Sequence, residues 1–146
     1  MIRTVRFESF PAPLSAVCLG TARFGGDYGE SRSFALLDRY YAMGGRFLDT
    51  ANVYGRWSPS GLNESERTVG RWLRARGITD MTVTSKCCHY APDAHDVSRV
   101  NRTAAEADLE ESRRSLGLDV IPIYLTHRDD PSADIRVIVD FLCDMV

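Results

Sequence analysis

The chain has 146 residues, of which 44% are hydrophobic and 26% are charged, and its formal net charge is -2. This length and composition suit one globular domain with its own core and exclude a disordered chain. The weak negative charge excludes a basic surface for nucleic acid or anionic lipid, and no apolar run reaches the length of a membrane span. The first residues lack the apolar core of a signal peptide, so we expect a cytoplasmic protein.

The cysteine pattern argues against disulfides and against a metal. Neighbouring Cys87 and Cys88 would point to opposite faces of a strand, and the spacing of the cysteines matches none of the zinc patterns. Cys88-His89, with His95 nearby, is the segment most open to interpretation as a metal site. Buried or strand-end thiols in a reducing compartment explain the same residues, and we predict no metal. The four cysteines are Cys18, Cys87, Cys88 and Cys143.

Extended stretches at the N-terminus predict a hairpin or lid and then a first buried strand. Residues 5–9 alternate between polar and apolar, the prolines at 11 and 13 interrupt the pattern, and Ser15–Gly20 is a second extended stretch that ends near Thr21. The glycines between 25 and 29 do not form a dinucleotide fingerprint, because no G-x-G-x-x-G precedes a helix.

Helices and strands then alternate along the chain. Helical spacing of apolar residues, capping residues and terminal glycines predict helices over residues 32–43, 63–77, 101–116 and 132–145. Asn63 with Glu66 three residues later has the pattern of a capping box. Apolar or β-branched runs predict strands over residues 46–49, 81–86 and 120–126, the last with Pro122 near its start. This order indicates a parallel sheet with right-handed crossovers.

Groups able to carry charge or protons stand where three of these strands end. Asp49, Lys86 and His127 hold those positions, and Tyr54 follows Asp49 in the next loop. Since the carboxyl ends of parallel strands meet at one edge of the sheet, we expect these side chains to converge there. Each has an ordinary explanation, such as a buried ion pair, a packing phenol or a loop histidine. Together they favour an active site.

The sequence resembles the aldo-keto reductase family, which comprises NADPH-dependent carbonyl reductases built on a (β/α)8 barrel. The matching pieces occur in family order and cover nearly the whole chain. They are Leu19-Gly20-Thr21, Phe47-Leu48-Asp49-Thr50-Ala51, Tyr54-Gly55, Asn63-Glu64-Ser65-Glu66, Gly70, Thr84-Ser85-Lys86, Asp108-Leu109-Glu110, Ser115-Leu116-Gly117 and His127-Arg128.

The resemblance implies an α/β fold of the TIM-barrel type. A full barrel needs roughly 250 residues, so we expect one domain over residues 1–146 that is a half barrel. It would contain four βα units and an N-terminal β-hairpin and be truncated after the fourth unit. The first and fourth strands would be open edges, through which the chain could form a homo-oligomer.

The resemblance also assigns roles at the predicted site. It implies a catalytic tetrad of Asp49, Tyr54, Lys86 and His127, NADPH bound in part by Gly20, Thr21 and Asp49, and no metal. Tyr54 would donate a proton to the reduced carbonyl oxygen, since a nearby ammonium such as that of Lys86 favours loss of the phenol proton. Asp49 would hold Lys86 in place, and His127 would orient the substrate oxygen.

The substrate side of the site is less defined by the sequence. Trp57 and Arg128 are candidates for the substrate pocket, although Trp57 could cover a helix and Arg128 could stiffen its loop in a salt bridge with Asp129. We expect a small aldehyde, ketone or sugar carbonyl as substrate and no nucleic acid or membrane partner. Most of the NADPH site lies in the family's second barrel half, so the isolated chain could be inactive. The alternative is a non-catalytic regulatory or remnant module.

Overall fold

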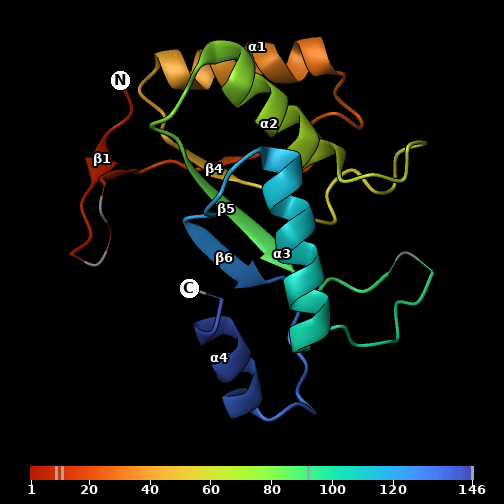
Figure 1. Ribbon diagram of the computed structural model, residues 1–146. Helices are drawn as coiled ribbons and strands as arrows, with labels where there is room; N and C mark the ends of the chain where they lie inside the picture. The colour runs from red at the N-terminus through yellow and green to blue at the C-terminus, as the bar shows by residue number, and fades with distance from the viewer. Residues whose placement is uncertain (9, 11, 92, 146) are drawn as a thin grey trace.

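The computed structural model describes residues 1–8, 10, 12–91 and 93–145. Strands β1 (Thr4–Val5) and β2 (Leu14–Ser15) form an antiparallel pair. A second sheet contains four parallel strands in the order β3-β4-β5-β6, which alternate with helices (Figure 1). Its elements are β3 (Leu19–Gly20), α1 (Glu30–Ala42), β4 (Phe47–Asp49), α2 (Glu64–Arg76), β5 (Thr82–Cys87), α3 (Arg102–Leu116), β6 (Ile123–Thr126) and α4 (Ile135–Cys143).

This architecture confirms the predicted half barrel with an N-terminal hairpin. The four strands pair in chain order, which leaves β3 and β6 at the edges of the sheet. The hairpin lies at the N-terminal end of the strands, because the backbone N–H of Arg46, just before β4, donates to the Ser15 hydroxyl. The predicted interruption at Pro11, and the end of the first extended stretch at Ser9, lie outside the described residues.

The side chains predicted to cap helices α1 and α2 make other hydrogen bonds instead. Helix α1 begins at Glu30, and the Ser33 hydroxyl donates to the carbonyl oxygens of Tyr28 and Gly29 instead of capping the helix. The predicted capping box of α2 is wrong: the Asn63 side chain accepts no hydrogen bond from the helix backbone, and its amide donates to the Glu66 carboxylate, 2.7 Å away.

Strand and helix ends are closer to expectation where proline or glycine controls them. Strand β6 is shorter than predicted and begins directly after Pro122, which lacks the N–H that a ladder needs. Helices α2 and α3 end where predicted, at Gly77 and Gly117, whose φ angles of 59° and 71° suit glycine. Helix α4 begins at Ile135, capped by the Asp134 carboxylate.

The parallel sheet has a covered outer face and an open inner face. Leu48 and Val83 are neighbours in adjacent strands, are fully buried, and pack with Leu37 of α1 and Trp72 of α2. On the inner face Leu125 is 45% exposed. The expected burial of the first strand is wrong, because Leu19 is only half buried and Gly20 is exposed at the edge of the sheet.

The cysteines are free thiols, two buried and two exposed. Cys87 and Cys88 lie inside a small core formed with Val100, Ala105 and Phe141, whereas Cys18 and Cys143 are at the surface. None of the helices in the described part of the chain is long and apolar enough to cross a membrane.

Candidate active site

Four predicted catalytic residues meet at the C-terminal edge of the parallel sheet. Asp49 is the last residue of β4, Lys86 lies near the end of β5, and His127 directly follows β6. Tyr54 lies in the loop after β4. Because the register of the strands places these ends side by side, the four side chains reach the same space.

An ion pair between Lys86 and Asp49 forms the base of the site. The ammonium nitrogen Nζ lies 2.8 Å from each carboxylate oxygen of Asp49 and donates to the Thr50 carbonyl oxygen at 2.7 Å. The side chain of Lys86 is 14% exposed, and that of Asp49 is 34% exposed. The charge of Lys86, the only lysine in the sequence, is therefore fixed and paired but still faces the open side of the sheet.

Tyr54 lies over this ion pair. The Nζ atom of Lys86 is 4.9 Å from the centre of the Tyr54 ring. The loop can take this course because residue 55 is glycine, with a φ angle of 92°. A Cβ atom at Gly55 would stand 2.8 Å from the backbone nitrogen of Glu64, so a larger residue would push the loop away from α2.

His127 completes the group. Its ring stands nearly perpendicular to that of Tyr54, with 5.5 Å between the ring centres. Burial, followed by the charges of His89 and Lys86, lowers the pKa of His127 to about 4, so the imidazole is neutral near pH 7. Its Nδ1 atom is buried and has no hydrogen-bond partner among the described residues. A neutral imidazole of this kind can donate a hydrogen bond to a ligand oxygen or accept one from a ligand.

The predicted cofactor residues have different surroundings. Gly20 is beside Asp49 in the sheet, and apart from residues 19–21 no atom lies within 4 Å of the place where its Cβ would stand, which leaves room for a flat ring. Thr21 is fully buried, and its hydroxyl bonds to the Asp49 carbonyl oxygen at 3.0 Å and to Ser65 at 2.8 Å. Gly20 and Asp49 thus fit one edge of a nicotinamide site, whereas Thr21 supports the loop after β4.

Of the predicted substrate residues, Trp57 lines a cavity and Arg128 stands behind its wall. Trp57 is 55% exposed, with its ring centre 6.3 Å from that of Tyr54. It borders a cavity of about 270 Å³ that Tyr54 and His127 also line. Arg128 donates instead to the His89 ring at 3.1 Å and to the Tyr90 hydroxyl at 2.8 Å.

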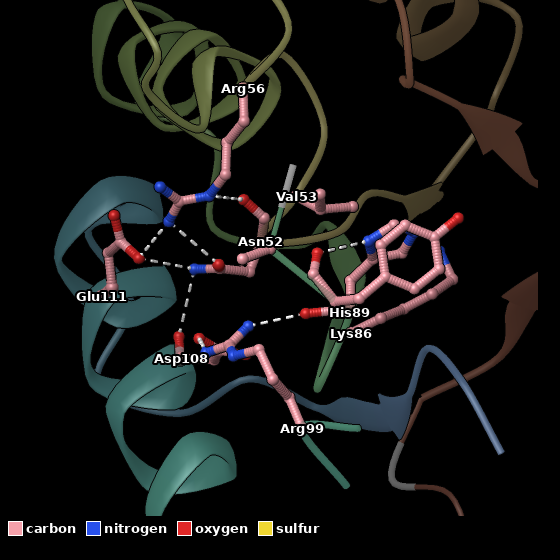
Figure 2. Close-up of a pocket in the computed structure, with 10 residues that line it drawn as sticks. Asn52, Val53, Arg56, Lys86, His89, Arg99, Asp108 and Glu111 are labelled. Atoms are coloured by element: carbon pink, nitrogen blue, oxygen red, sulfur yellow. Dashed lines mark hydrogen bonds and ion pairs between the residues drawn. The ribbon is translucent and has the colours of Figure 1, made fainter. Parts of the chain in front are cut away.

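Sequence reasoning missed a set of polar residues that hold the loop after β4 against α3 (Figure 2). The Asn52 amide donates to the Glu111 carboxylate at 3.0 Å, and its oxygen accepts from Arg56, also at 3.0 Å. Arg56 and Glu111 form a short ion pair. This network fixes the segment between Asp49 and Tyr54 from behind.

Asp108 of α3 holds the loop after β5 in the same way. Its carboxylate accepts the backbone N–H of Cys88 at 2.8 Å and pairs with Arg99 at 2.7 Å. Arg99 also donates to the His89 carbonyl oxygen at 2.7 Å, visible in Figure 2. The sequence places Asp108 only within the matching piece Asp108-Leu109-Glu110 and assigns it no role. A further signal is that it is an acid in the buried stripe of α3, between Ala105 and Ser112.

Comparisons with known proteins show similarity to one family over most of the chain. Residues 16–146 match the family model described as the Aldo/keto reductase family. The chain is 31% identical to norsolorinic acid reductase stcV of Emericella nidulans over 91% of its length, and 32% identical to the uncharacterized oxidoreductase YrpG of Bacillus subtilis over 80%. It covers only 36% and 37% of those two proteins, so it spans little more than a third of their length.

A solved structure is also similar to this chain and is also covered only in part. The aldo-keto reductase AKR11C1 from Bacillus halodurans, in its holo form, superimposes on 99% of the chain with a TM-score of 0.79. The sequence identity is 20%, and the chain covers 46% of that protein. This likeness shows the fold, since it extends over every element of the half barrel.

Proposed function

Because the chain belongs to the aldo-keto reductase family, we propose that it reduces the carbonyl group of an aldehyde, ketone or sugar to an alcohol with NADPH. The observation that carries this proposal is the Lys86 ammonium, held 2.8 Å from both Asp49 oxygens and 4.9 Å from the centre of the Tyr54 ring. The overall reaction consumes one carbonyl, one NADPH and one proton, and it yields one alcohol and one NADP⁺.

When bound, the nicotinamide would supply a hydride to the carbonyl carbon. The oxygen then gains negative charge and must receive a proton. Tyr54 is the proton donor, because its phenol is in the site and the nearby Lys86 ammonium stabilises the phenolate that remains. Asp49 keeps that ammonium in place, and Gly20 leaves the space beside it open for the cofactor ring.

His127 positions the carbonyl oxygen. Its ring is neutral near pH 7 because burial lowers its pKa to about 4, so it can donate a hydrogen bond without itself competing as an acid. Its edge-on contact with Tyr54 supports this role, because one carbonyl oxygen would then have both groups beside it. A carbonyl held between them would meet its proton donor and its orienting group together.

The test follows NADPH consumption by absorbance with a panel of aldehydes, ketones and sugars. We expect carbonyl-dependent oxidation of NADPH by the wild-type protein and a loss of about 100-fold or more for Tyr54→Phe, since removing a proton donor has an effect of that order. Equal rates in the two proteins would refute the role of Tyr54. A folded wild-type protein without activity on any carbonyl would favour the non-catalytic module instead.

A further inference from the structure

Two neighbouring cysteines stand where β5 passes into the next loop. Cys87 is the last residue of β5, and Cys88 is the first residue of the loop. On a continuous strand their side chains would point to opposite faces. In the structure the two sulfur atoms are instead 3.5 Å apart and share a hydrogen bond. The predicted separation of the two thiols is therefore wrong, because the strand ends between them.

The backbone of Cys88 brings the second thiol back toward the first. Its φ angle is 62°, and among the residues that the structure describes it is the only one other than glycine with a positive φ. This left-handed conformation is unfavourable for a residue with a Cβ atom. The Asp108 carboxylate holds the turn by accepting the Cys88 N–H at 2.8 Å. Backbone strain that surrounding contacts maintain in this way is found mainly at functional sites.

A cavity gives small molecules access to one of the two thiols. Both cysteines are only 1% exposed at the molecular surface. Cys88, however, borders a cavity of about 250 Å³ between the loops after β5 and β6, and Cys87 is not among its lining residues in the described chain. A cavity of this size holds several molecules as small as water, and hydrogen peroxide is little larger. A molecule that enters it meets the Cys88 thiol first.

The surroundings also make Cys88 the more acidic thiol of the pair. A hydrogen bond from the Cys87 thiol lowers the pKa of Cys88 against the opposing effect of burial, and the charge of Arg99 lowers it further. The same hydrogen bond, followed by burial, raises the pKa of Cys87. Because the thiolate is the reactive form of cysteine, Cys88 would react first and Cys87 second.

From this geometry we propose that Cys87 and Cys88 form a redox-sensitive site, which a peroxide oxidises to a disulfide between the two residues. The Cys88 thiolate attacks one peroxide oxygen, the O–O bond breaks, and Cys88 becomes a sulfenic acid while hydroxide leaves and takes up the proton that Cys88 lost. The Cys87 sulfur then attacks the Cys88 sulfur, and the hydroxyl group leaves with the Cys87 proton as water. Two thiols and one hydrogen peroxide thus yield one disulfide and two waters.

This disulfide should be reversible and should move the loop. Neighbouring Cα atoms are about 3.8 Å apart, whereas disulfides usually join Cα atoms at least about 4.4 Å apart. A disulfide between neighbours is therefore strained, and strained disulfides are reduced easily. The sulfurs must also approach from 3.5 Å to about 2 Å, which moves the backbone just before His89. The ring of His89, 4.7 Å from that of His127, reports this movement.

Peroxide treatment followed by peptide mapping tests the site, and it needs neither cofactor nor carbonyl. The reduced 146-residue protein is treated with hydrogen peroxide, unfolded in an alkylating reagent, digested and analysed by mass spectrometry. We expect the peptide with Cys87 and Cys88 to lose two hydrogens before the exposed thiols of Cys18 and Cys143 are oxidised, and dithiothreitol to restore it. Oxidation of the exposed thiols alone, a sulfinic or sulfonic acid at Cys88, or disulfides to other cysteines would overturn the proposal.

Two variants, each checked for native circular dichroism, test the order of the reaction. Cys88→Gly suits the left-handed backbone, and Cys87→Ala keeps a small apolar side chain in the core. Dimedone, which traps sulfenic acids, should label Cys88 in Cys87→Ala at least about tenfold faster than it labels Cys87 in Cys88→Gly, since the more acidic thiol is more often ionised. Equal rates would refute Cys88 as the first thiol to react.

NMR of the imidazole groups provides a structural readout of the same site. On peroxide treatment the His89 signals should shift in the wild-type protein and return on reduction, whereas in Cys88→Gly they should not move. Shifts of equal size in both proteins would mean that peroxide acts elsewhere, and this would overturn the proposal. Because no step of these tests involves NADPH, a failure of the proposed carbonyl reduction would leave their outcome unchanged.

Discussion

On the outer face of the parallel sheet, Leu48 and Val83 are fully buried under the helices, whereas on the inner face the paired charges of Asp49 and Lys86 remain 34% and 14% exposed. The outer face also buries a carboxylate, that of Glu66, which accepts hydrogen bonds from Asn63 and Ser85 within the fold. The outer face therefore serves packing, whereas the inner face keeps its polar groups accessible to a ligand. Substitutions on the two faces should therefore affect different measurements.

Glu66→Ala should have the largest effect on stability. Glu66 accepts hydrogen bonds from Asn63 at 2.7 Å and from Ser85 at 2.5 Å, and it has no exposed surface. Its loss leaves both donors unpaired around a cavity, so the free energy of unfolding should fall by about 3 kcal/mol or more. Denaturant unfolding measures this. A change below about 0.5 kcal/mol would contradict the outer-face account.

Glu66→Gln is the matched control because it keeps the shape of the side chain. Burial raises the pKa of Glu66, so over the interval from its ordinary value up to its raised value the folded state holds a proton that the unfolded state has released. The contribution of Glu66 to stability therefore declines as pH rises through that interval. The glutamine variant should lack this decline, and an unchanged pH profile would show that Glu66 stays ionised in the folded protein.

Lys86→Met should reverse the pattern, with a large effect on turnover and a small one on stability. Without the ammonium the phenolate of Tyr54 loses its stabilising charge, and carbonyl reduction should fall about 100-fold or more. The remaining Asp49 carboxylate is partly hydrated, so unfolding should change by less than about 1 kcal/mol.

Arg76→Met provides the comparison for Lys86→Met, since Arg76 forms an exposed ion pair with Asp38 among the outer helices. Its turnover should equal that of the wild type. Equal losses of activity in both variants would mean that the Lys86 charge has no special position.

His127 provides a pH-dependent test of the inner face. In the folded protein its pKa is lowered to about 4 from an ordinary 6.5. Between about pH 6.5 and 4 the unfolded chain binds a proton at His127 that the folded protein does not bind. The contribution of His127 to the free energy of unfolding should therefore be complete above pH 6.5 and decline as pH falls from about 6.5 to 4. Imidazole NMR signals follow the titration directly. A midpoint near 6.5 in the folded chain would show that His127 is not buried beside Tyr54.

Self-association should give the smallest effect. The inner face exposes 45% of Leu125 on edge strand β6, and open parallel edges favour pairing. We expect light scattering to report a mass above the 16.3 kDa of one chain, and Leu125→Lys to lower it. A wild-type monomer at all concentrations would contradict this expectation.

Local rules predicted much of the fold. Glycines end α2 and α3, proline delays the start of β6, and strand ends carry Asp49 and Lys86, all of which depend on neighbours in sequence. The hairpin and the order of the four strands followed from the same patterns. These features could be read because proline, glycine and β-branched residues restrict the backbone wherever they occur.

Distant partners account for what the sequence did not predict. Asn63 does not cap α2 because its side-chain oxygen accepts from the Ser115 hydroxyl and its amide donates to Ser115 and Glu66. Arg128 bonds to residues of the loop after β5 instead of Asp129. The Asn52 and Asp108 contacts to the two loops likewise join residues far apart in the chain. Such contacts depend on how helices pack over the sheet, which spacing alone does not reveal.

Transfer of deuterium from NADPH tests the central claim most directly. NADPH with deuterium in place of both C4 hydrogens of the nicotinamide is incubated with the protein and an aldehyde, and the alcohol is analysed by mass spectrometry and NMR. We predict one deuterium on the alcohol carbon with the wild-type protein, and transfer reduced about 100-fold or more with Tyr54→Phe. Unlabelled alcohol, or transfer undiminished in Tyr54→Phe, would contradict the account.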